Sequence, residues 1–311
     1  MFTGNRLTEV FNSSKEIPFD DSSKFILFSD CHRGDNSLAD DFSHNQNIFF
    51  YALNYYYNNG FAYIEIGDGD ELWENRKFTT IRSAYSHIFK LMSKFHQNNR
   101  FYFIWGNHNR KWKNPKNVKK HLYGYYNERK DCHEPLFEGI ETHEGLILQY
   151  SDTKNKIFLT HGHQGQFLND SFWWVGRLCV STIWKLLQSI GVEDTTSPAK
   201  NFKTRIKIEK EISKWATNNN QIIIAGHTHR SVFPNPTEPP YFNTGSCVHP
   251  HCITGIEIQN GKIVLIKWSI NIKPDGTMYI DRQELVESEK LNKYFWKRDQ
   301  LSAPIFPPLN N

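Results

Sequence analysis

Seven polar residues of the kinds that bind transition metals stand just after short apolar runs in this sequence. They are two aspartates, one asparagine and four histidines: Asp30, His32, Asp68, Asn107, His161, His227 and His229. Such mixed oxygen and nitrogen ligands suit manganese, iron or zinc, whereas four imidazoles argue against a site for magnesium alone. Seven ligands exceed the needs of one ion but suit two ions that share a bridge. The sequence therefore predicts two divalent metal ions, with manganese as the first choice.

Five short apolar segments must position these side chains. Each has four or five apolar, β-branched or aromatic residues, followed by polar residues that include a candidate ligand: KFILFSD, AYIEIGDGD, FYFIWGNHN, KIFLTHGH and QIIIAGHTH. This pattern predicts buried strands that end in polar loops. Asp30 and His32 alternate across Cys31, so both side chains can point to one side of a strand end and bind one cation.

The segments between these strands indicate an α/β architecture. Apolar and aromatic residues at mixed three- and four-residue spacing predict helices over Asn45–Asn58 and Ile81–Gln97. Strands alternating with helices are typical of α/β proteins. Later in the chain, CITGIEIQ and KIVLIKWSI flank Asn260-Gly261, a dipeptide that favours a tight hairpin turn. We expect a second, antiparallel sheet there.

Composition sets broad limits on the protein class. The 311 residues, 38% of them hydrophobic, can bury the core of one large domain with a helical insertion. A net charge of +4 suits a phosphorylated substrate but requires neither nucleic acid nor an anionic membrane. Five dispersed cysteines without a CxxC pair favour a reducing cytoplasm, and we expect neither an export signal nor a transmembrane segment.

The order of the motifs resembles that of a known superfamily. D-x-H, G-D, G-N-H, H and G-H-x-H follow one another between Phe25 and Arg230, as in the calcineurin-like metallophosphoesterases. Within that superfamily, SDCHRGD and GDGDELW look closest to the bacterial group that includes UDP-diacylglucosamine pyrophosphohydrolases. The resemblance implies a four-layer αββα sandwich, in which two face-to-face sheets are flanked by helices and a helical insertion lies between the fourth and fifth ligand motifs.

The resemblance also implies a role for each site residue. Asp30, His32 and His229 would hold one metal ion, Asn107, His161 and His227 the other, and Asp68 would bridge them, while His108 would be the catalytic imidazole. The implied domain organisation is an N-terminal extension over residues 1–23, a metallophosphoesterase domain over 24–284 that includes the insert 166–217, and a C-terminal tail over 285–311.

The expected activity is hydrolysis of a phosphomonoester, phosphodiester or pyrophosphate. Two ions about 3.5–4 Å apart can bridge a water and lower its pKa from about 15.7 towards about 7, which supplies an attacking hydroxide. His108 could then protonate the leaving oxygen or stabilise phosphoryl charge. Alternatives within the superfamily are a nuclease, a protein phosphatase and a non-catalytic interaction scaffold. A nuclease is not favoured, because the basic residues are not regularly interleaved with aromatic ones.

Several neighbouring residues have two interpretations. Arg33 either contacts a substrate phosphate or forms a surface salt bridge. Asn109 stands where superfamily members commonly have Asp or Glu, so a carboxylate that could orient a neighbouring group is missing. Asp70 and Glu71 are interpreted as supporting or surface carboxylates, and His163 as a residue that supports the ligands. Asn243 is either a turn residue or near the site.

The long connection between His161 and His227 predicts two helices, one rich in Trp and Leu and the other basic. Together they could cover an amphiphilic, lipid-like phosphorylated substrate and make a peripheral membrane contact. Alternatively, they pack on their own domain or on a second subunit.

Overall fold

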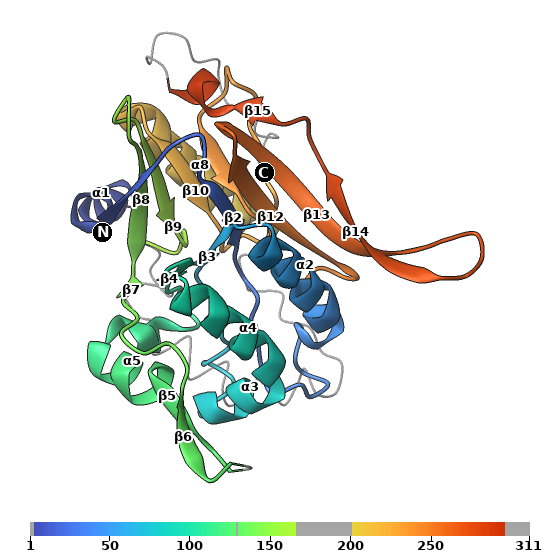
Figure 1. The fold of residues 1–311 in the computed structure, drawn as a ribbon. Coiled ribbons are helices and arrows are strands. Elements are labelled where there is room, and N and C mark those ends of the chain that lie inside the picture. Colours follow the sequence, from blue (N-terminus) through green and yellow to red (C-terminus); the bar gives the residue numbers. More distant parts are fainter. Residues whose placement is uncertain (1–2, 129, 166–200, 296–311) are drawn as a thin grey trace.

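Two β-sheets form the centre of the protein. A computed structural model describes residues 3–128, 130–165 and 201–295 (Figure 1). The larger sheet has eight strands. Seven of them lie in the order β14 (Met278–Glu284), β13 (Lys262–Ile272), β12 (Cys252–Gln259), β2 (Lys24–Phe28), β3 (Ala62–Ile66), β4 (Phe101–Ile104) and β7 (Thr142–His143). The eighth, β15 (Glu289–Lys290), pairs with β13. Strands β2, β3, β4 and β7 run parallel to one another, and β12 joins β2 in antiparallel fashion.

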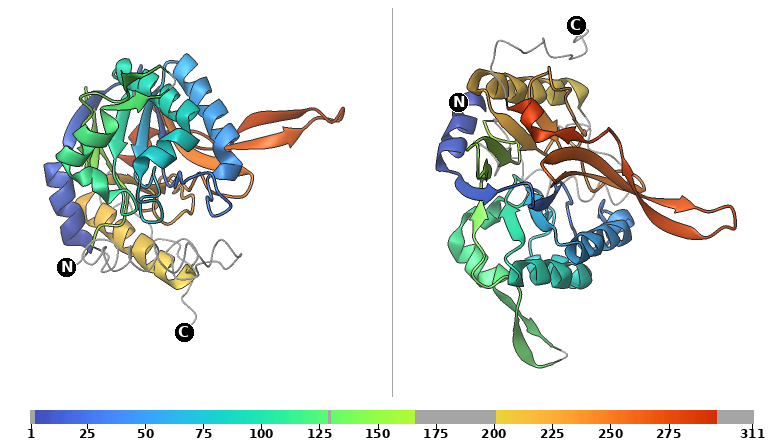
Figure 2. Two further views of the ribbon diagram at one scale, coloured as in Figure 1. Left: turned by 90° about the horizontal axis from the view of Figure 1, so that it is seen from below. Right: turned by 45° about the horizontal axis from the view of Figure 1, so that its top comes forward.

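The smaller sheet has five strands. Their order is β1 (Lys15–Phe19), β8 (Gly145–Tyr150), β9 (Lys156–Thr160), β10 (Ile222–Ala225) and β11 (Tyr241–Asn243). Strands β9, β10 and β11 are parallel, whereas β8 and β9 are antiparallel. A separate two-stranded hairpin is formed by β5 (Gly124–Asn127) and β6 (Cys132–Pro135). Strands β13 and β14 extend as a ribbon that projects from the body (Figure 2).

Side-chain alternation along the strands builds the layers. On β2, Phe25 and Leu27 belong to the core between the two sheets, whereas Ile26 and Phe28 belong to the core beneath the helices of the larger sheet. Ile224 of β10, in the smaller sheet, belongs to the same core as Phe25 and Leu27. Because successive side chains of a strand point to opposite faces, a strand that is apolar throughout must be covered on both sides.

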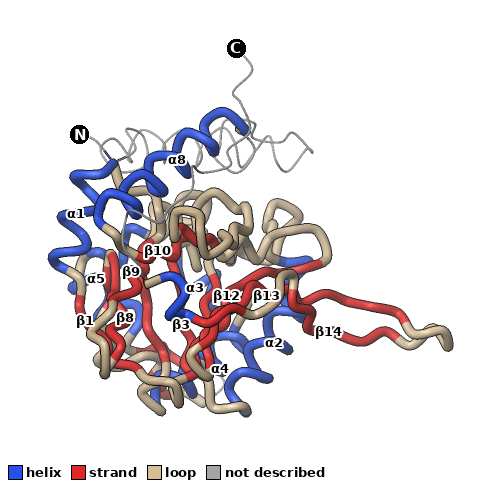
Figure 3. Tube along the Cα trace, turned by 90° about the horizontal axis from the view of Figure 1, so that it is seen from above, coloured by secondary structure: helices blue, strands red, loops and turns tan. Residues whose placement is uncertain are grey.

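Helices cover the outer face of each sheet. The larger sheet is covered by α2 (Gln46–Asn58), α3 (Phe78–Ala84), α4 (Ser86–Gln97) and α5 (Pro115–Leu122), and the smaller sheet by α1 (Thr3–Ser13) and α8 (Phe202–Asn219). Short 3₁₀ turns lie at Ser43–Asn45, Arg110–Lys113 and Leu291–Tyr294. The strands lie between the two groups of helices (Figure 3). This arrangement confirms the predicted four-layer αββα sandwich.

Local sequence determines where α8 begins and ends. Asn201 precedes the helix, and its side-chain oxygen accepts a hydrogen bond from the Thr204 backbone N–H at 3.1 Å, which satisfies one of the free donors of the first turn. Asn220 follows the helix with a left-handed backbone at φ 49°, a conformation that ends helices and that asparagine tolerates. The basic helix predicted in the long connection is thus confirmed.

One sequence-based expectation needs correction, and the two terminal segments contribute elements to the sheets. The hairpin around Asn260-Gly261 forms, but its strands extend the larger sheet beside β2 instead of forming a second sheet. The segment expected as an extension, residues 1–23, supplies α1 and also β1, which pairs with β8. Part of the tail expected from residue 285 packs as β15 and the 3₁₀ turn Leu291–Tyr294, which enters the inter-sheet core.

Parts of the chain lie outside the described residues. Of the insert expected over 166–217, residues 166–200 are outside, as are residues 296–311 of the expected tail. The four cysteines that are described, Cys31, Cys132, Cys247 and Cys252, are free thiols. Within the described ranges, no helix combines the length and hydrophobicity that crossing a lipid bilayer requires.

Replacing Leu27 tests the inter-sheet core. Leu27 is fully buried, so Leu27→Ala leaves a cavity and should lower the free energy of unfolding by about 2–5 kcal/mol in urea denaturation. Leu38→Ala is the matched control, because the Leu38 side chain is 97% exposed and its loss should change stability by no more than about 0.5 kcal/mol. Equal effects of the two substitutions would contradict the layer assignment.

Candidate metal centre

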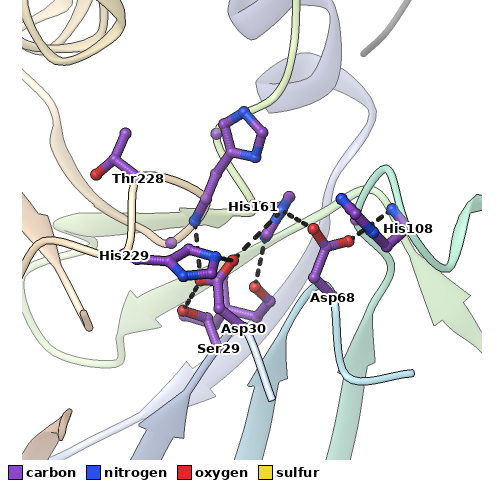
Figure 4. A network of polar contacts seen from close by, with 12 residues as sticks. Ser29, Asp30, Asp68, His108, His161, Thr228 and His229 are labelled. Atoms are coloured by element: carbon purple, nitrogen blue, oxygen red, sulfur yellow. Dashed lines mark hydrogen bonds and ion pairs between the residues drawn. The ribbon is translucent and has the colours of Figure 1, made fainter. Parts of the chain in front are cut away.

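The seven predicted ligands lie at the carboxyl ends of strands in both sheets. They comprise Asp30 and His32 after β2, Asp68 after β3, Asn107 after β4, His161 after β9, and His227 and His229 after β10. Strands β2, β3 and β4 are parallel neighbours, as are β9 and β10, so their carboxyl ends lie together within each sheet. Figure 4 shows labelled members of this set converging.

Six of the seven form two clusters of potential ligand atoms. Asp30, His32 and His229 offer atoms within 4.8 Å of one another, and so do Asp68, His161 and His227. In the first cluster, His229 Nε2 lies 3.2 Å from Asp30 Oδ1 and 3.3 Å from His32 Nε2. In the second, His161 Nε2 lies 2.9 Å from Asp68 Oδ2. The members match the two ligand sets that the sequence resemblance implies, apart from Asn107.

The two clusters adjoin through their carboxylates. Asp68 Oδ2 lies 2.9 Å from His161 Nε2 and 3.9 Å from His32 Nε2, so one oxygen faces an imidazole of each cluster. Asp30 Oδ1 also lies 3.9 Å from His161 Nε2. The position of Asp68 between the clusters fits the bridging role expected for it.

The residues present fit a pair of metal ions. Asp30 Oδ1, Asn107 Oδ1 and His161 Nε2 are buried atoms that make no hydrogen bond, and each belongs to a predicted ligand. Asp30 Oδ1 and His161 Nε2 face ion-pair partners, His229 Nε2 at 3.2 Å and Asp68 Oδ2 at 2.9 Å. Burial of Asn107 Oδ1 without a hydrogen bond costs free energy unless a cation satisfies this oxygen. The opposite atom of two of these groups is fixed: His161 Nδ1 hydrogen-bonds the Ile66 carbonyl at 2.9 Å, and Asp30 Oδ2 accepts from the His227 backbone N–H at 2.9 Å. Each side chain is therefore oriented by one atom and presents the other.

The electrostatics keep both carboxylates charged. Burial raises the pKa of Asp30, but the imidazoles of His229 and His161 outweigh it and hold the pKa of this carboxyl well below its usual value. Burial also raises the pKa of Asp68, but the imidazoles of His161 and His108 outweigh burial and lower this pKa. Burial together with His161 lowers the pKa of His227 to about 3. Ionised carboxylates and a neutral imidazole are the forms that bind a metal.

The backbone at the ligands is unusual. Five of the seven predicted ligands have a left-handed backbone, which is rare for residues other than glycine. Their φ angles are 51° at Asp30, 46° at His32, 50° at Asp68, 70° at His227 and 54° at His229. Such conformations cost roughly 1–3 kcal/mol each for ordinary residues and concentrate at functional sites. Two motif positions require glycine because a predicted ligand lies close to the backbone there. A Cβ at Gly106 would collide with Asp68, and a Cβ at Gly226 would collide with Asp30. The loops thus aim the ligands at the expense of local strain.

Glu71 is a site residue that the sequence interpretation underestimated. Its Oε2 atom lies 2.7 Å from His32 Nδ1 and 2.6 Å from His108 Nδ1, so one carboxylate holds both a predicted ligand and the predicted catalytic imidazole. Burial raises the pKa of Glu71, but His108 and His32 outweigh burial and lower this pKa to about 2. The signal available in the sequence was its position three residues after Asp68 in the same loop.

Trp73 and Asn109 explain how His108 is held without a carboxylate at position 109. The indole of Trp73 stacks on the His108 ring with centroids 4.2 Å apart and planes at 19°. Asn109 does not substitute for an acid, because its Oδ1 atom accepts a hydrogen bond from the Gly106 backbone N–H at 2.6 Å and closes the loop. Glu71 supplies the orienting carboxylate instead.

Arg33 forms salt bridges, as one of its two interpretations expected, but they are buried and not at the surface. Its side chain is fully buried, so it lies neither at the surface nor in reach of a substrate in solution. The guanidinium donates to both Glu65 oxygens, at 2.7 and 2.9 Å, and to Asp70 Oδ1 at 3.0 Å. Asp70 also accepts from the Trp112 indole N–H at 3.0 Å. Arg33 and Asp70 therefore form a buried ionic network directly beneath the ligand loops.

His163 and Asn243 have distinct positions. His163 is fully buried beside His161, with ring centroids 5.4 Å apart, but belongs to neither ligand cluster. Burial, together with His161 and His227, holds the pKa of His163 well below its usual value. Asn243 donates to the Gly226 carbonyl at 2.7 Å. Asn243 thus supports the loop that carries His227 and His229.

Replacing Arg33 tests the buried ionic network. Arg33→Met removes the cation that pairs with two buried carboxylates, Glu65 and Asp70, so the free energy of unfolding should fall by about 3–5 kcal/mol. Lys15→Met is the control, because Lys15 pairs with Glu141 at the surface and such pairs contribute at most about 1 kcal/mol. Urea denaturation compares the two variants. A loss for Arg33→Met no larger than that for Lys15→Met would disprove the network's role in stability.

Comparison with known proteins assigns the chain to a family. Among solved structures, the crystal structure of Chaetomium thermophilum Vps29 aligns over 85% of this chain and 97% of its own, with 9% sequence identity and a TM-score of 0.34. No curated protein sequence matches the chain. Residues 23–231 match the family described as calcineurin-like phosphoesterase. Because that match covers more than half of the 311 residues, the chain belongs to the calcineurin-like phosphoesterase family.

Proposed function

We propose that this protein is a metal-dependent phosphohydrolase that uses two divalent ions to hydrolyse a phosphomonoester, phosphodiester or pyrophosphate. The observation that carries this proposal is the pair of ligand clusters that adjoin at Asp68, whose Oδ2 atom faces His161 of one cluster and His32 of the other. The buried Asn107 Oδ1 atom, which accepts no hydrogen bond from the described residues, supports it independently. Membership of the calcineurin-like phosphoesterase family supports the general reaction class.

The ligand sets divide the work of holding two ions. Asp30, His32 and His229 would hold one ion, Asn107, His161 and His227 the other, and Asp68 would bridge them. When bound, the ions would supply a bridging hydroxide at neutral pH and Lewis acidity towards the phosphoryl oxygens. The mixture of imidazole and oxygen ligands favours manganese, with iron or zinc as alternatives.

His108 is suited to act as the general acid. Its Nδ1 atom faces Glu71, and its ring is fixed by the stacked Trp73, so Nε2 is the nitrogen that remains for a substrate oxygen. The side chain is 22% exposed, in contrast to the buried carboxylates of the ligand set. We propose that His108 protonates the leaving oxygen or stabilises phosphoryl charge, while Glu71 fixes its tautomer.

The alternatives differ in how well the site supports them. A non-catalytic scaffold has no need for converging ligands, whereas all seven residues are present here and six of them form the two clusters. Nuclease and protein phosphatase activities would use the same ligands, so only substrates distinguish them. The ideas of a lipid-like substrate and of peripheral membrane contact depend on residues 166–200, outside the described residues, and stay predictions.

Metal analysis combined with a substrate panel tests the proposed function. Purified protein should bind two manganese ions per chain and hydrolyse bis-p-nitrophenyl phosphate, and chelation should abolish this activity. Monoester, pyrophosphate and fluorescent oligonucleotide substrates would then identify the leaving group. Asp68→Ala should remove activity and reduce metal content, because Asp68 faces both clusters. A protein without metal and inactive with every divalent ion tried would refute the proposal.

The roles of His108 and Glu71 can be separated from metal binding. His108→Asn should lower kcat by about 10²–10⁴-fold with unchanged metal content, as expected for loss of a general acid. Glu71→Gln should lower activity by about 10–100-fold, because Glu71 orients His32 as well as His108. Glu138→Gln, at an exposed carboxylate, should match the wild type. Loss of metal from His108→Asn would reassign His108 as a ligand.

A further inference from the structure

The loop after β10 carries two predicted ligands in a strained conformation. His227 and His229 both have left-handed backbone angles, at φ 70° and 54°. The residue between them, Thr228, is fully buried, and its backbone N–H donates to the Gly226 carbonyl at 2.8 Å. A loop of this kind relaxes unless surrounding contacts hold it.

The Thr228 side chain provides such contacts. Its hydroxyl donates to Glu209 Oε1 at 3.0 Å and accepts from Asn243 Nδ2 at 3.1 Å. Asn243 also donates to the Gly226 carbonyl at 2.7 Å, so the loop is held on two sides. Figure 4 shows Thr228 on the strand-end loop that also carries His229.

Glu209 connects this loop to a rigid element. Its carboxylate is fully buried on α8, whose neighbouring residues Ile208 and Ile212 pack in the core of the smaller sheet. The Arg230 side chain also donates to Glu209, with its Nε atom 3.0 and 3.1 Å from the two carboxylate oxygens. The carboxylate therefore contacts residues on both sides of His229, although it touches no predicted ligand side chain itself.

We infer that Glu209, acting through the Thr228 hydroxyl, is a positioning residue that sets the metal affinity of His227 and His229. This inference rests on the proposed metal-dependent function. Partners that orient ligands raise metal affinity because the ion then need not order the loop on binding. A purely structural role would stabilise the apo protein without changing its affinity for metal, and the two roles are therefore separable.

A pair of substitutions at Thr228 provides the test. Thr228→Val keeps the shape but removes the hydroxyl, and it should weaken manganese binding, measured by calorimetry against a competing chelator, by about 10–100-fold. Thr228→Ser restores the hydroxyl and should bind within about threefold of the wild type. Glu209→Leu should reproduce the loss of Thr228→Val, because it removes the acceptor of the hydrogen bond whose donor Thr228→Val removes. Thermal unfolding in chelator reports the stability of each apo protein.

The possible outcomes distinguish the inference from the function on which it rests. If the wild type binds manganese and Thr228→Val binds it equally well, with only a lower apo unfolding midpoint, the positioning role is overturned and the proposed function stands. Equal weakening in Thr228→Ser and Thr228→Val would also overturn it, since the hydroxyl would then be irrelevant. If the wild type binds no divalent ion, the proposed function fails, and the inference fails with it.

Discussion

Burial of two ionised carboxylates is the constraint on which the site depends. Asp30 and Asp68 are both almost fully buried, and each oxygen that faces no imidazole is held by a backbone N–H. Asp30 Oδ2 accepts from His227 N at 2.9 Å, which joins the β2 loop to the β10 loop of the other sheet. Asp68 Oδ1 accepts from His108 N at 2.8 Å, which joins the β3 and β4 loops. The carboxylates thus hold together the loops that surround them.

A second layer of polar contacts holds the loops of β2 and β3 in register beneath the site. The backbone N–H of His32 donates to the Asp68 carbonyl at 2.8 Å, and that of Arg33 donates to the Gly69 carbonyl at 3.0 Å. The Arg33 guanidinium then neutralises Glu65 and Asp70, which lie within this junction. A buried cation balanced by two carboxylates is costly to break, so the ligand loops are organised by the protein itself.

The strands and their ligands could be predicted because their signals are local. An apolar run followed by polar residues identifies a buried strand and its loop, and the structure confirms all five such segments as β2, β3, β4, β9 and β10. The alternation of Phe25 and Leu27 with Ile26 and Phe28 marks a strand that is buried on both faces. The motif order selected seven candidate ligands, and the structure brings six of them into two clusters.

What the sequence could not reveal depends on contacts between distant segments. Arg33 follows His32 directly, yet its partners Glu65 and Asp70 lie more than 30 residues away, so adjacency suggested a surface role that burial rules out. β1 pairs in parallel with β8, whose residues lie about 130 positions later, and no local pattern indicates such a pairing. The sequence does not distinguish Glu71 from other acidic residues, because its role depends on contacts with His32 and His108 that only the fold brings about.

The separation of the ligands along the chain also constrains how the protein is made. His32 and His229 lie 197 residues apart, yet their Nε2 atoms come within 3.3 Å. A ribosome must therefore synthesise β10 and the loop after it before the first cluster can close, whereas Asp30 and His32 emerge early. Until that point the nascent chain presents only part of the proposed ligand set. The proposed metal site can therefore form only after β10 and the loop that follows it have been made.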